Sequence, residues 1–290
     1  MDSRSRATAL AALVFGAVAI GFAPIFVRVT ETGPVAAGFW RLALALPLLA
    51  PFALREGEGK PEPLMLLAGL FFACDLGLWH YSIMFTSVAN ATVLANLTPI
   101  VVTAAGWWLF RERPARAFLI GLALGVAGAV IVAMSHRAGP PVSAHARLGD
   151  LFALGTTVWY ASYFLAVRHL RGNRSTAAIM FWSSLVGVAL LGGAMLVLHE
   201  QVIPSGLPGW GACVGLALVH VFGQGAIAWA LGRLPAATAA VVVLIQPVVA
   251  AFLGWILFSE AVAPMQAAGA VLALAGVAIA QWAAGRQEPS

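Results

Sequence analysis

Residues 91–131 have the sequence ATVLANLTPIVVTAAGWWLFRERPARAFLIGLALGVAGAVI, and residues 239–279 have AAVVVLIQPVVAAFLGWILFSEAVAPMQAAGAVLALAGVAI. The two stretches align without a gap at an offset of 148 residues, with 15 of 41 positions identical. Matches between Ala, Leu or Val carry little weight, because apolar segments share these residues. Paired Pro, Trp and Glu residues at a single offset carry more: Pro99/Pro247, Trp107/Trp255 and Glu112/Glu260. We therefore interpret the two stretches as an internal duplication.

The composition around this duplication excludes a soluble enzyme. Apolar residue types make up 61% of the 290 residues and charged types 9%, and the mean hydropathy is +0.93. Soluble domains carry roughly 25% charged residues, and a water-exposed surface this apolar would aggregate. The basic residues are scattered over loops rather than clustered, so no nucleic-acid partner is expected. The two cysteines lie in apolar runs and no phosphate-binding loop occurs, so neither a metal nor a cofactor is predicted.

The chain divides into ten apolar segments of about 20 residues, the length that crosses a bilayer as a helix. They are residues 7–29, 34–54, 63–85, 88–110, 115–134, 148–168, 176–198, 209–231, 236–258 and 264–284. An offset of 148 residues covers five such segments, an odd number, so the second half enters the membrane from the opposite side. The predicted fold is an all-α membrane protein with ten transmembrane helices in two inverted five-helix repeats, residues 1–140 and 141–290.

The distribution of Lys and Arg predicts the orientation. The termini and alternate loops carry twelve basic residues and the other side carries three, while Arg41 lies near a helix end in the second segment. This bias predicts cytoplasmic N- and C-termini in a multi-pass protein of the bacterial inner membrane. Arg4 and Arg6 resemble the basic start of a signal peptide, but the following apolar run extends beyond Val27, so we interpret it as the first span.

Pro99 and Pro247 fall in the centres of the fourth and ninth segments. A central proline removes a backbone donor, which is tolerated in lipid where a cavity or a neighbouring group satisfies the backbone. The pair is therefore predicted either to form a hinge near a binding site or to kink two helices for packing. Glu112 and Glu260 are expected to cap or pair a helix junction, with a substrate role as the alternative.

Glycines recur at helical spacing in segments five and ten, at Gly121, Gly125 and Gly128 and at Gly269 and Gly276. Small residues at this spacing allow close helix packing. The contact is predicted to lie inside the chain, with a dimer interface as the alternative, so the protein is expected to be a monomer or a homodimer.

Ionisable residues at membrane depth are expensive and mark functional sites. Asp75 lies near the middle of the third segment, with no carboxylate partner identifiable in the sequence. It is a candidate proton carrier, ammonium partner or structural anchor. His80 either lines a cavity or satisfies a helix contact.

Further polar and aromatic residues lie at mid-depth in other segments. They are His220 and Gln224 in the eighth, Trp159, Tyr160 and Tyr163 in the sixth, and Asn96, Thr98 and Gln246 beside the central prolines. Each one alone is explained equally well as a hydrogen bond between helices. Together they predict an aromatic-walled cavity with almost no fixed charge, which suits a neutral or zwitterionic substrate.

Several of these residues resemble the EamA family, the ten-helix branch of the drug/metabolite transporter superfamily. The similar motifs are Asp75-x3-Trp79-His80, residues 86–92 (TSVANAT), Asn96-Leu97-Thr98-Pro99, Glu112-Arg113 and Phe39-Trp40-Arg41, with Pro247, Gly254, Glu260, Gln266 and Gly269 as a weaker second copy. The resemblance covers the whole chain and departs in the first segment, where Ile20-Gly21 replaces a common tryptophan-glycine pair. A first-helix tryptophan contact is therefore not carried over.

The resemblance implies alternating access around a central cavity and export of small metabolites, often amino acids, with the YddG-type aromatic amino-acid exporters as the nearest branch. The expected substrate contacts are Trp79, His80, Tyr81, Asn96, Trp159, Tyr160, Tyr163, His220, Gln224 and Gln246. Asp75 or His80 would couple protons, unless the protein is a uniporter, and Pro99 and Pro247 would be hinges. The alternative cargo is a lipophilic cationic drug with Asp75 as counter-charge. An intramembrane enzyme is a distant alternative, because such sites need two or more carboxylates or a metal cluster.

Overall fold

The fold was analysed in a computed structural model, which describes residues 3–55, 60–85, 94–95, 97–111, 113–135, 145–258 and 264–287. Every regular element in these ranges is helical. In the first half they are α1 Ser3–Ile20, α2 Ala23–Val29, α3 Pro34–Ala43, α4 Leu46–Arg55, α5 Pro63–Phe85, α7 Thr98–Phe110 and α8 Arg116–Ser135. In the second they are α9 Ala146–Leu170, α10 Thr176–Val197, α11 Leu207–Leu218, the π-helix η1 Val219–Gln224, α12 Gly225–Leu231, α13 Ala236–Val243, α14 Ile245–Phe258 and α15 Pro264–Gln287.

Seven helical stretches of the described chain are long and apolar enough to cross a membrane. They are Arg4–Val29, Pro34–Leu54, Pro63–Ser82, Thr176–Val197, Leu207–Leu231, Ala236–Leu257 and Pro264–Ala284. Thr98–Leu109 and Arg116–Ile131 are shorter apolar helices, and α9 occupies the predicted segment 148–168. The chain is therefore a multi-pass membrane protein, and the count of ten spans stays a prediction.

Four helices that begin within a predicted span carry a proline in their first turn. Pro24 follows the break between α1 and α2, Pro47 the break between α3 and α4, and Pro247 the break at Leu244 between α13 and α14. Pro99 is the second residue of α7. Proline lacks the N–H that a continuous helix needs but fits a first turn, where that donor has no helical partner. Proline placement thus explains why these spans are divided.

Helices α8 and α15 pack backbone to backbone. A Cβ built on Gly128 would lie 2.2 Å from the Ala273 nitrogen, and one on Gly276 would lie 2.2 Å from the Gly125 nitrogen. The contacts run antiparallel, since Gly121 meets Ala280 at the other end of the same interface. The predicted glycine contact is thus confirmed as one inside the chain.

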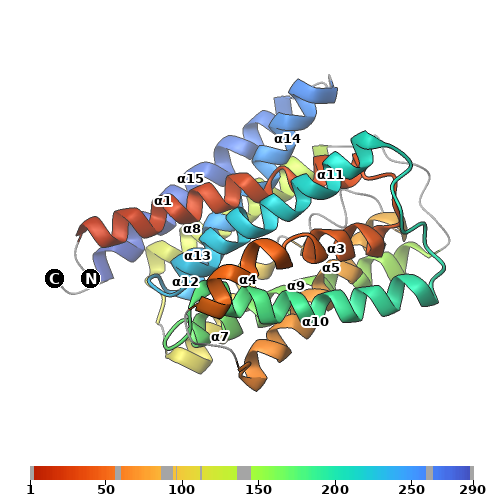
Figure 1. The fold of residues 1–290 in the computed structure, drawn as a ribbon. Coiled ribbons are helices and arrows are strands. Elements are labelled where there is room, and N and C mark those ends of the chain that lie inside the picture. The colour runs from red at the N-terminus through yellow and green to blue at the C-terminus, as the bar shows by residue number, and fades with distance from the viewer. Residues whose placement is uncertain are drawn as a thin grey trace.

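Helix neighbours in the bundle come from both halves of the chain (Figure 1). Helix α5 packs along α9 and α10, α1 packs along η1 and α12, and α7 contacts α9 and α13. Helix α3 lies between α10 and α11. The start of α1 and the end of α15 lie at the same end of the molecule (Figure 1).

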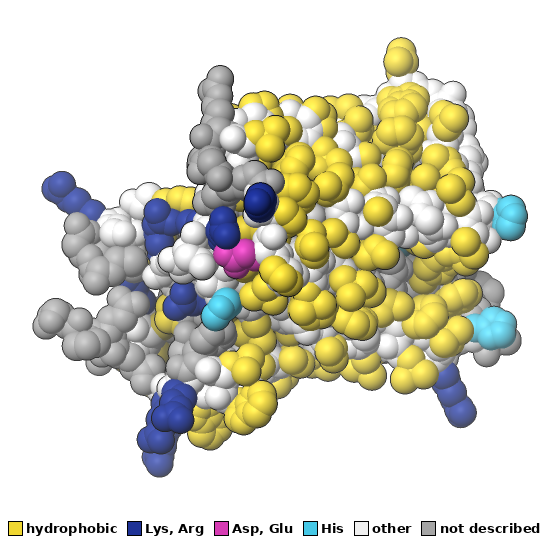
Figure 2. All heavy atoms as spheres, turned by 60° about the horizontal axis from the view of Figure 1, so that its bottom comes forward, with side chains coloured by type: hydrophobic (Ala, Val, Ile, Leu, Met, Phe, Trp, Pro, Cys, Tyr) yellow, Lys and Arg dark blue, Asp and Glu magenta, His cyan; other side chains and the backbone are white. Residues whose placement is uncertain are grey.

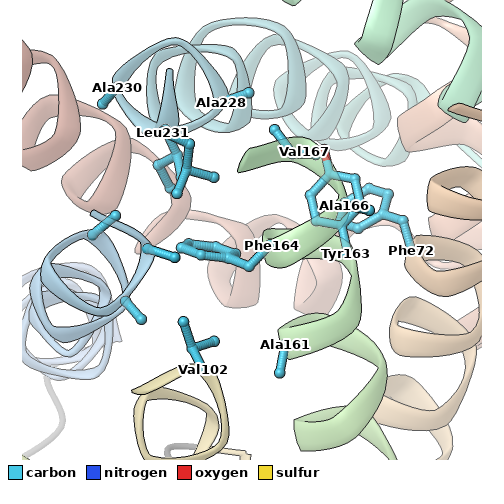
Figure 3. Close-up of a cluster of buried hydrophobic side chains, with 14 of the residues drawn as sticks. Phe72, Val102, Ala161, Tyr163, Phe164, Ala166, Val167, Ala228, Ala230 and Leu231 are labelled. Atoms are coloured by element: carbon cyan, nitrogen blue, oxygen red, sulfur yellow. The ribbon is translucent and has the colours of Figure 1, made fainter. Parts of the chain in front are cut away.

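The hydrophobic core lies where α9 meets these neighbours. Tyr163 points from α9 toward Phe72 of α5, while the adjacent Phe164 points toward Leu231 of α12 and Val102 of α7 (Figure 3). All five side chains are almost fully buried. Successive residues of α9 therefore contact opposite sides of the bundle.

The outer surface is apolar, as lipid requires. Phe52, Trp108 and Leu151 each expose more than half of their surface. Figure 2 shows apolar side chains across the middle of one face, with most of its Lys and Arg residues toward the end that carries the termini.

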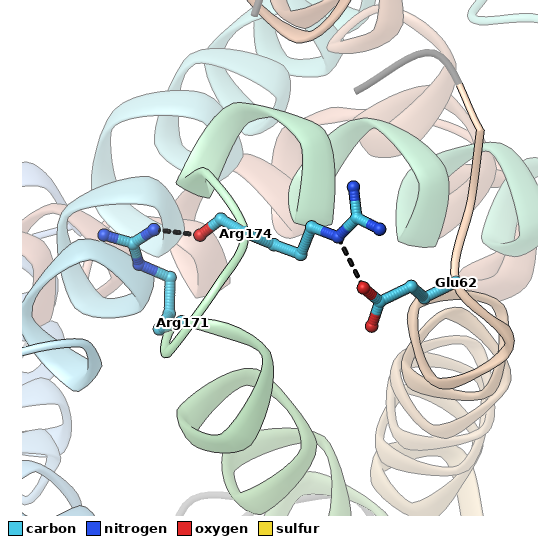
Figure 4. A network of polar contacts seen from close by, with 3 residues as sticks. All are labelled: Glu62, Arg171 and Arg174. Carbon is cyan, nitrogen blue, oxygen red and sulfur yellow. Dashed lines mark hydrogen bonds and ion pairs between the residues drawn. The ribbon is translucent and has the colours of Figure 1, made fainter. Parts of the chain in front are cut away.

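Polar contacts tie the two halves together at both ends. At one end, the Arg174 Nε donates to Glu62 Oε1 at 2.5 Å, and Arg171 donates to the Arg174 carbonyl (Figure 4). At the other, the Glu200 carboxylate accepts from the backbone N–H groups of Val35 and Ala36, at 3.3 and 2.9 Å. An anion at a helix N-terminus is favourable, so Glu200 caps α3 across the two halves.

Candidate functional site

Polar side chains from five helical elements, all of them buried except the half-buried Tyr160, meet near the centre of the bundle. This central polar cluster consists of Arg41 of α3, Asp75 of α5, Tyr160 and Tyr163 of α9, Ser184 of α10, and His220 and Gln224 of η1. The aromatic ring of Phe72 lies among them, with its centroid 4.7 Å from that of Tyr163 and 5.3 Å from that of His220.

Arg41 and Ser184 are the members of the cluster that the sequence analysis did not name as site residues. Arg41 was placed near a helix end in the second segment, but it is only 5% exposed, and its guanidinium carbon lies 5.7 Å from the centroid of the Phe72 ring. Local structure accounts for its position: α3 ends at Ala43, so Arg41 stands in the last helical turn at mid-span. The carbonyl groups at a helix C-terminus favour a cation there. The break before Pro47 was the sequence signal that would have located it.

Asp75 is also buried, at 7% exposure, and its electrostatic partner is Arg41. The expectation of a site with almost no fixed charge did not include Arg41, which lies in the same buried cluster as Asp75. No direct ion pair joins them within the described part of the chain. The Thr156 hydroxyl donates to the Asp75 carbonyl at 3.5 Å, which links α5 to α9 at this depth.

The π-helix η1 supplies His220 and Gln224, each 1% exposed. Short π-helical insertions are rare and occur frequently at functional sites. The Ser184 hydroxyl and the His220 Nε2 form a hydrogen bond of 3.0 Å, while the His220 Nδ1 has no partner. Gln224 lies beside the hydroxyls of Tyr160 and Tyr163.

Aromatic rings form one wall of the cluster. The rings of Tyr160 and Tyr163 are nearly parallel, with centroids 6.3 Å apart, and Phe72 stacks on Tyr163. The predicted Trp159 contacts a different ring, that of Phe71, with centroids 5.7 Å apart.

Three of the remaining predicted contacts, Trp79, His80 and Tyr81, lie toward the end of α5. His80 is buried, and neither ring nitrogen has a hydrogen-bond partner, while its ring centroid lies 5.1 Å from that of Trp79. The Tyr81 hydroxyl donates to Glu200 at 2.6 Å and so joins the cap on α3. Gln246 lies in the first turn of α14, and its Nε2 is buried and unpartnered. Asn96, Glu112 and Glu260 lie outside the described residues.

Several buried polar atoms of the cluster have no hydrogen-bond partner in the protein. These include Arg41 Nε, Tyr163 Oη, His220 Nδ1 and Gln224 Nε2. Buried polar groups are almost always hydrogen-bonded, because an unmet donor costs about 1–3 kcal/mol. Donors, an acceptor and stacking rings in one place can bind a small polar molecule with an apolar part. Among the described residues, no three His, Cys, Asp or Glu side chains gather as a metal site requires.

A helical bundle with an apolar surface and a buried polar centre is the arrangement of a membrane transporter. The pattern of the EamA-like transporter family matches residues 7–134 and again 147–281, and the chain belongs to this family.

Relatives of known sequence are named as transporters. The chain is 28% identical to the pseudopaline exporter CntI of Pseudomonas aeruginosa over 72% of each chain. It is 26% identical to an uncharacterized transporter of Archaeoglobus fulgidus, over 93% of this chain and 95% of that one. It is 28% identical to the uncharacterized transporter YwfM of Bacillus subtilis over 88% and 86%. A protein of known crystal structure has the same fold, with a TM-score of 0.79 at 21% identity over 98% of this chain and 99% of that chain.

Proposed function

We propose that this protein exports amino acids or similar small zwitterionic metabolites across the bacterial inner membrane by alternating access around the central polar cluster. The observation that carries the proposal is the convergence of buried, unpartnered polar atoms from α3, α9 and η1 beside stacked aromatic rings. Polar groups can hold a zwitterionic head while the rings pack against an apolar side chain.

Two inverted five-helix repeats, residues 1–140 and 141–290 in ten spans, would give the protein its two access states. Helix contacts support this symmetry. At the offset of 148 residues, α5 corresponds to α11 through α12 and α9 to α1, and both the α5–α9 pair and the α1–α12 pair are in contact. The same offset of 148 residues relates α8 to α15, and these two helices pack on each other. The family pattern also matches once in each half.

Both termini would lie in the cytoplasm. The start of α1 and the end of α15 share one end of the bundle, and basic side chains gather toward that end (Figures 1 and 2). Positive loops are retained on the cytoplasmic side. Glu200 would then cap α3 at the outer end, while Glu62 and Arg174 would join the halves at the inner end.

The substrate would contact the residues of the cluster and those at the adjoining end of α5. The proposed contacts are Trp79, His80, Tyr81, Asn96, Trp159, Tyr160, Tyr163, His220, Gln224 and Gln246. Rings would stack on the substrate side chain, as the YddG-type resemblance implies for aromatic amino acids. Pro99 and Pro247 would serve as hinges, since each starts a helix at mid-span, where the chain bends most readily.

A lipophilic cation is a weaker candidate cargo. Asp75 would be its counter-charge, but Asp75 shares the cluster with Arg41, which would repel a ligand that carries only positive charge. An Asp75→Asn variant that loses dye export but keeps amino-acid flux would favour the cation.

Counterflow in proteoliposomes tests the proposal. Purified protein is reconstituted with an unlabelled amino acid inside, and uptake of the labelled form is followed for a panel of amino acids. Accumulation above that of protein-free vesicles is expected for at least one aromatic or apolar member. No accumulation across the whole panel would refute amino-acid transport.

Coupling is tested in the same vesicles with an imposed pH gradient. If Asp75 or His80 exchanges a proton for substrate, the gradient accelerates uptake in one direction. Asp75→Asn abolishes that acceleration if Asp75 is the carrier, and His80→Gln abolishes it if His80 is the carrier. Equal rates with and without the gradient would identify a uniporter.

A further inference from the structure

Arg41 occupies an energetically unusual position. A cation at mid-depth in a membrane is costly unless it is paired or hydrogen-bonded. Arg41 is only 5% exposed, its Nε has no hydrogen-bond partner, and no direct ion pair with Asp75 forms in the described chain. The Phe72 ring centroid lies 5.7 Å from the Arg41 guanidinium carbon, and this cation–π contact compensates only part of the cost of burying the charge.

Among the described residues, Asp75 is the only acidic side chain found to interact with Arg41. Besides Asp75, the groups that interact with it electrostatically are His80, His220, Tyr160 and Tyr163, which are neutral or aromatic side chains. Arg41 and Asp75 are thus two opposite charges in one buried cluster, each lacking a direct ionic contact. A molecule with an anionic and a cationic group can contact both, whereas a singly charged molecule leaves one of them unmatched.

We infer that Arg41 and Asp75 together determine the substrate class: Arg41 binds the carboxylate of a zwitterion and Asp75 binds its ammonium group. This assignment rests on the proposed function and sharpens it, because it attributes each half of the substrate's head group to one named side chain. Arg41 adds a specificity-determining residue to the expected contacts.

Binding of three matched probes to the purified full-length protein tests this assignment. Phenylalanine carries both charges, 2-phenylethylamine lacks the carboxylate, and 3-phenylpropionate lacks the ammonium group. Arg41→Gln should weaken binding of phenylalanine and 3-phenylpropionate on the order of 10- to 100-fold, the loss expected for one charge-assisted contact, and leave 2-phenylethylamine unaffected. Asp75→Asn should weaken phenylalanine and 2-phenylethylamine by a similar factor and spare 3-phenylpropionate.

Two further variants keep the test decisive if a single substitution impairs folding. The double variant Arg41→Gln/Asp75→Asn leaves no unmatched buried charge, and it should bind the three probes with equal, weak affinity. Arg147→Gln, on an exposed arginine in the first turn of α9, removes the same charge away from the cluster and should bind like the wild type.

The outcomes separate this assignment from the proposed function. If the wild type transports and binds phenylalanine but both variants lose all three probes equally, or lose none, the charge assignment is overturned while amino-acid export stands. If the wild type neither binds nor transports any zwitterion, both fail together.

Discussion

Replacing Gly128 by alanine should destabilise the protein, although alanine is the better helix former. On an open helix surface, Gly→Ala gains about 1 kcal/mol. At Gly128 the new methyl carbon would lie 2.2 Å from the Ala273 nitrogen and 2.6 Å from the Gly269 carbonyl oxygen, both of them backbone atoms. Because backbone cannot rotate away, α8 and α15 would have to separate by about 1 Å, and overpacking of this kind costs about 1–3 kcal/mol.

The assay is thermal unfolding of the detergent-purified protein, followed by the loss of the monodisperse peak in size-exclusion chromatography. A change of this size should lower the midpoint by several degrees. Gly193→Ala is the matched control, since a Cβ there meets nothing within 4 Å, and it should be neutral or slightly stabilising. Equal midpoints for Gly128→Ala and Gly193→Ala would refute the close packing of α8 on α15.

Three further experiments test contacts at the centre and at both ends. Glu200→Gln removes the anion at the N-terminus of α3 and should lower the thermal midpoint by a few degrees, about 1–2 kcal/mol; an unchanged midpoint would exclude the cap. Ser184→Ala should cost about 1 kcal/mol by leaving His220 Nε2 without its hydrogen bond, and no loss in thermal unfolding would contradict that contact. A double-mutant cycle on Glu62 and Arg174, which are 31% and 27% exposed, should give a coupling below about 1 kcal/mol, and a value above about 2 kcal/mol would argue against solvent screening of this pair.

Much of the fold was predictable from the sequence, because apolar segments, glycine spacing and proline positions each have a direct structural effect. The apolar segments correspond to helices, and the glycine spacing in segments five and ten predicted the interface of α8 with α15. Pro247 was expected to interrupt a span and follows the break at Leu244. Pro24 and Pro47 carried the same signal for α2 and α4, but they were not interpreted as breaks.

The candidate site was only partly predictable, because burial of a charge is a property of packing. Asp75 was identified from its depth in a single segment. Arg41 was not, since its depth becomes clear only when α3 ends at Ala43 and packs against α5 and α10. Glu200 lies between α10 and α11 and reaches α3 from 164 residues along the chain, a pairing that local sequence does not indicate.

The π-helix η1 determines how α12 is rotated about the helix axis relative to α11. A π-turn holds one residue more than an α-turn, so η1 is equivalent to a single-residue insertion in a continuous helix. The π-turn absorbs the extra residue, so deleting one residue from Val219–Gln224 would restore α-helical geometry without rotating α12 relative to α11. Straightening η1 into an α-helix without a deletion would instead rotate α12 by about 100° relative to α11. In an alignment of related chains, a one-residue gap at this position would therefore mark members that lack the π-turn and present a different set of side chains at this level, while the flanking helices keep their orientation.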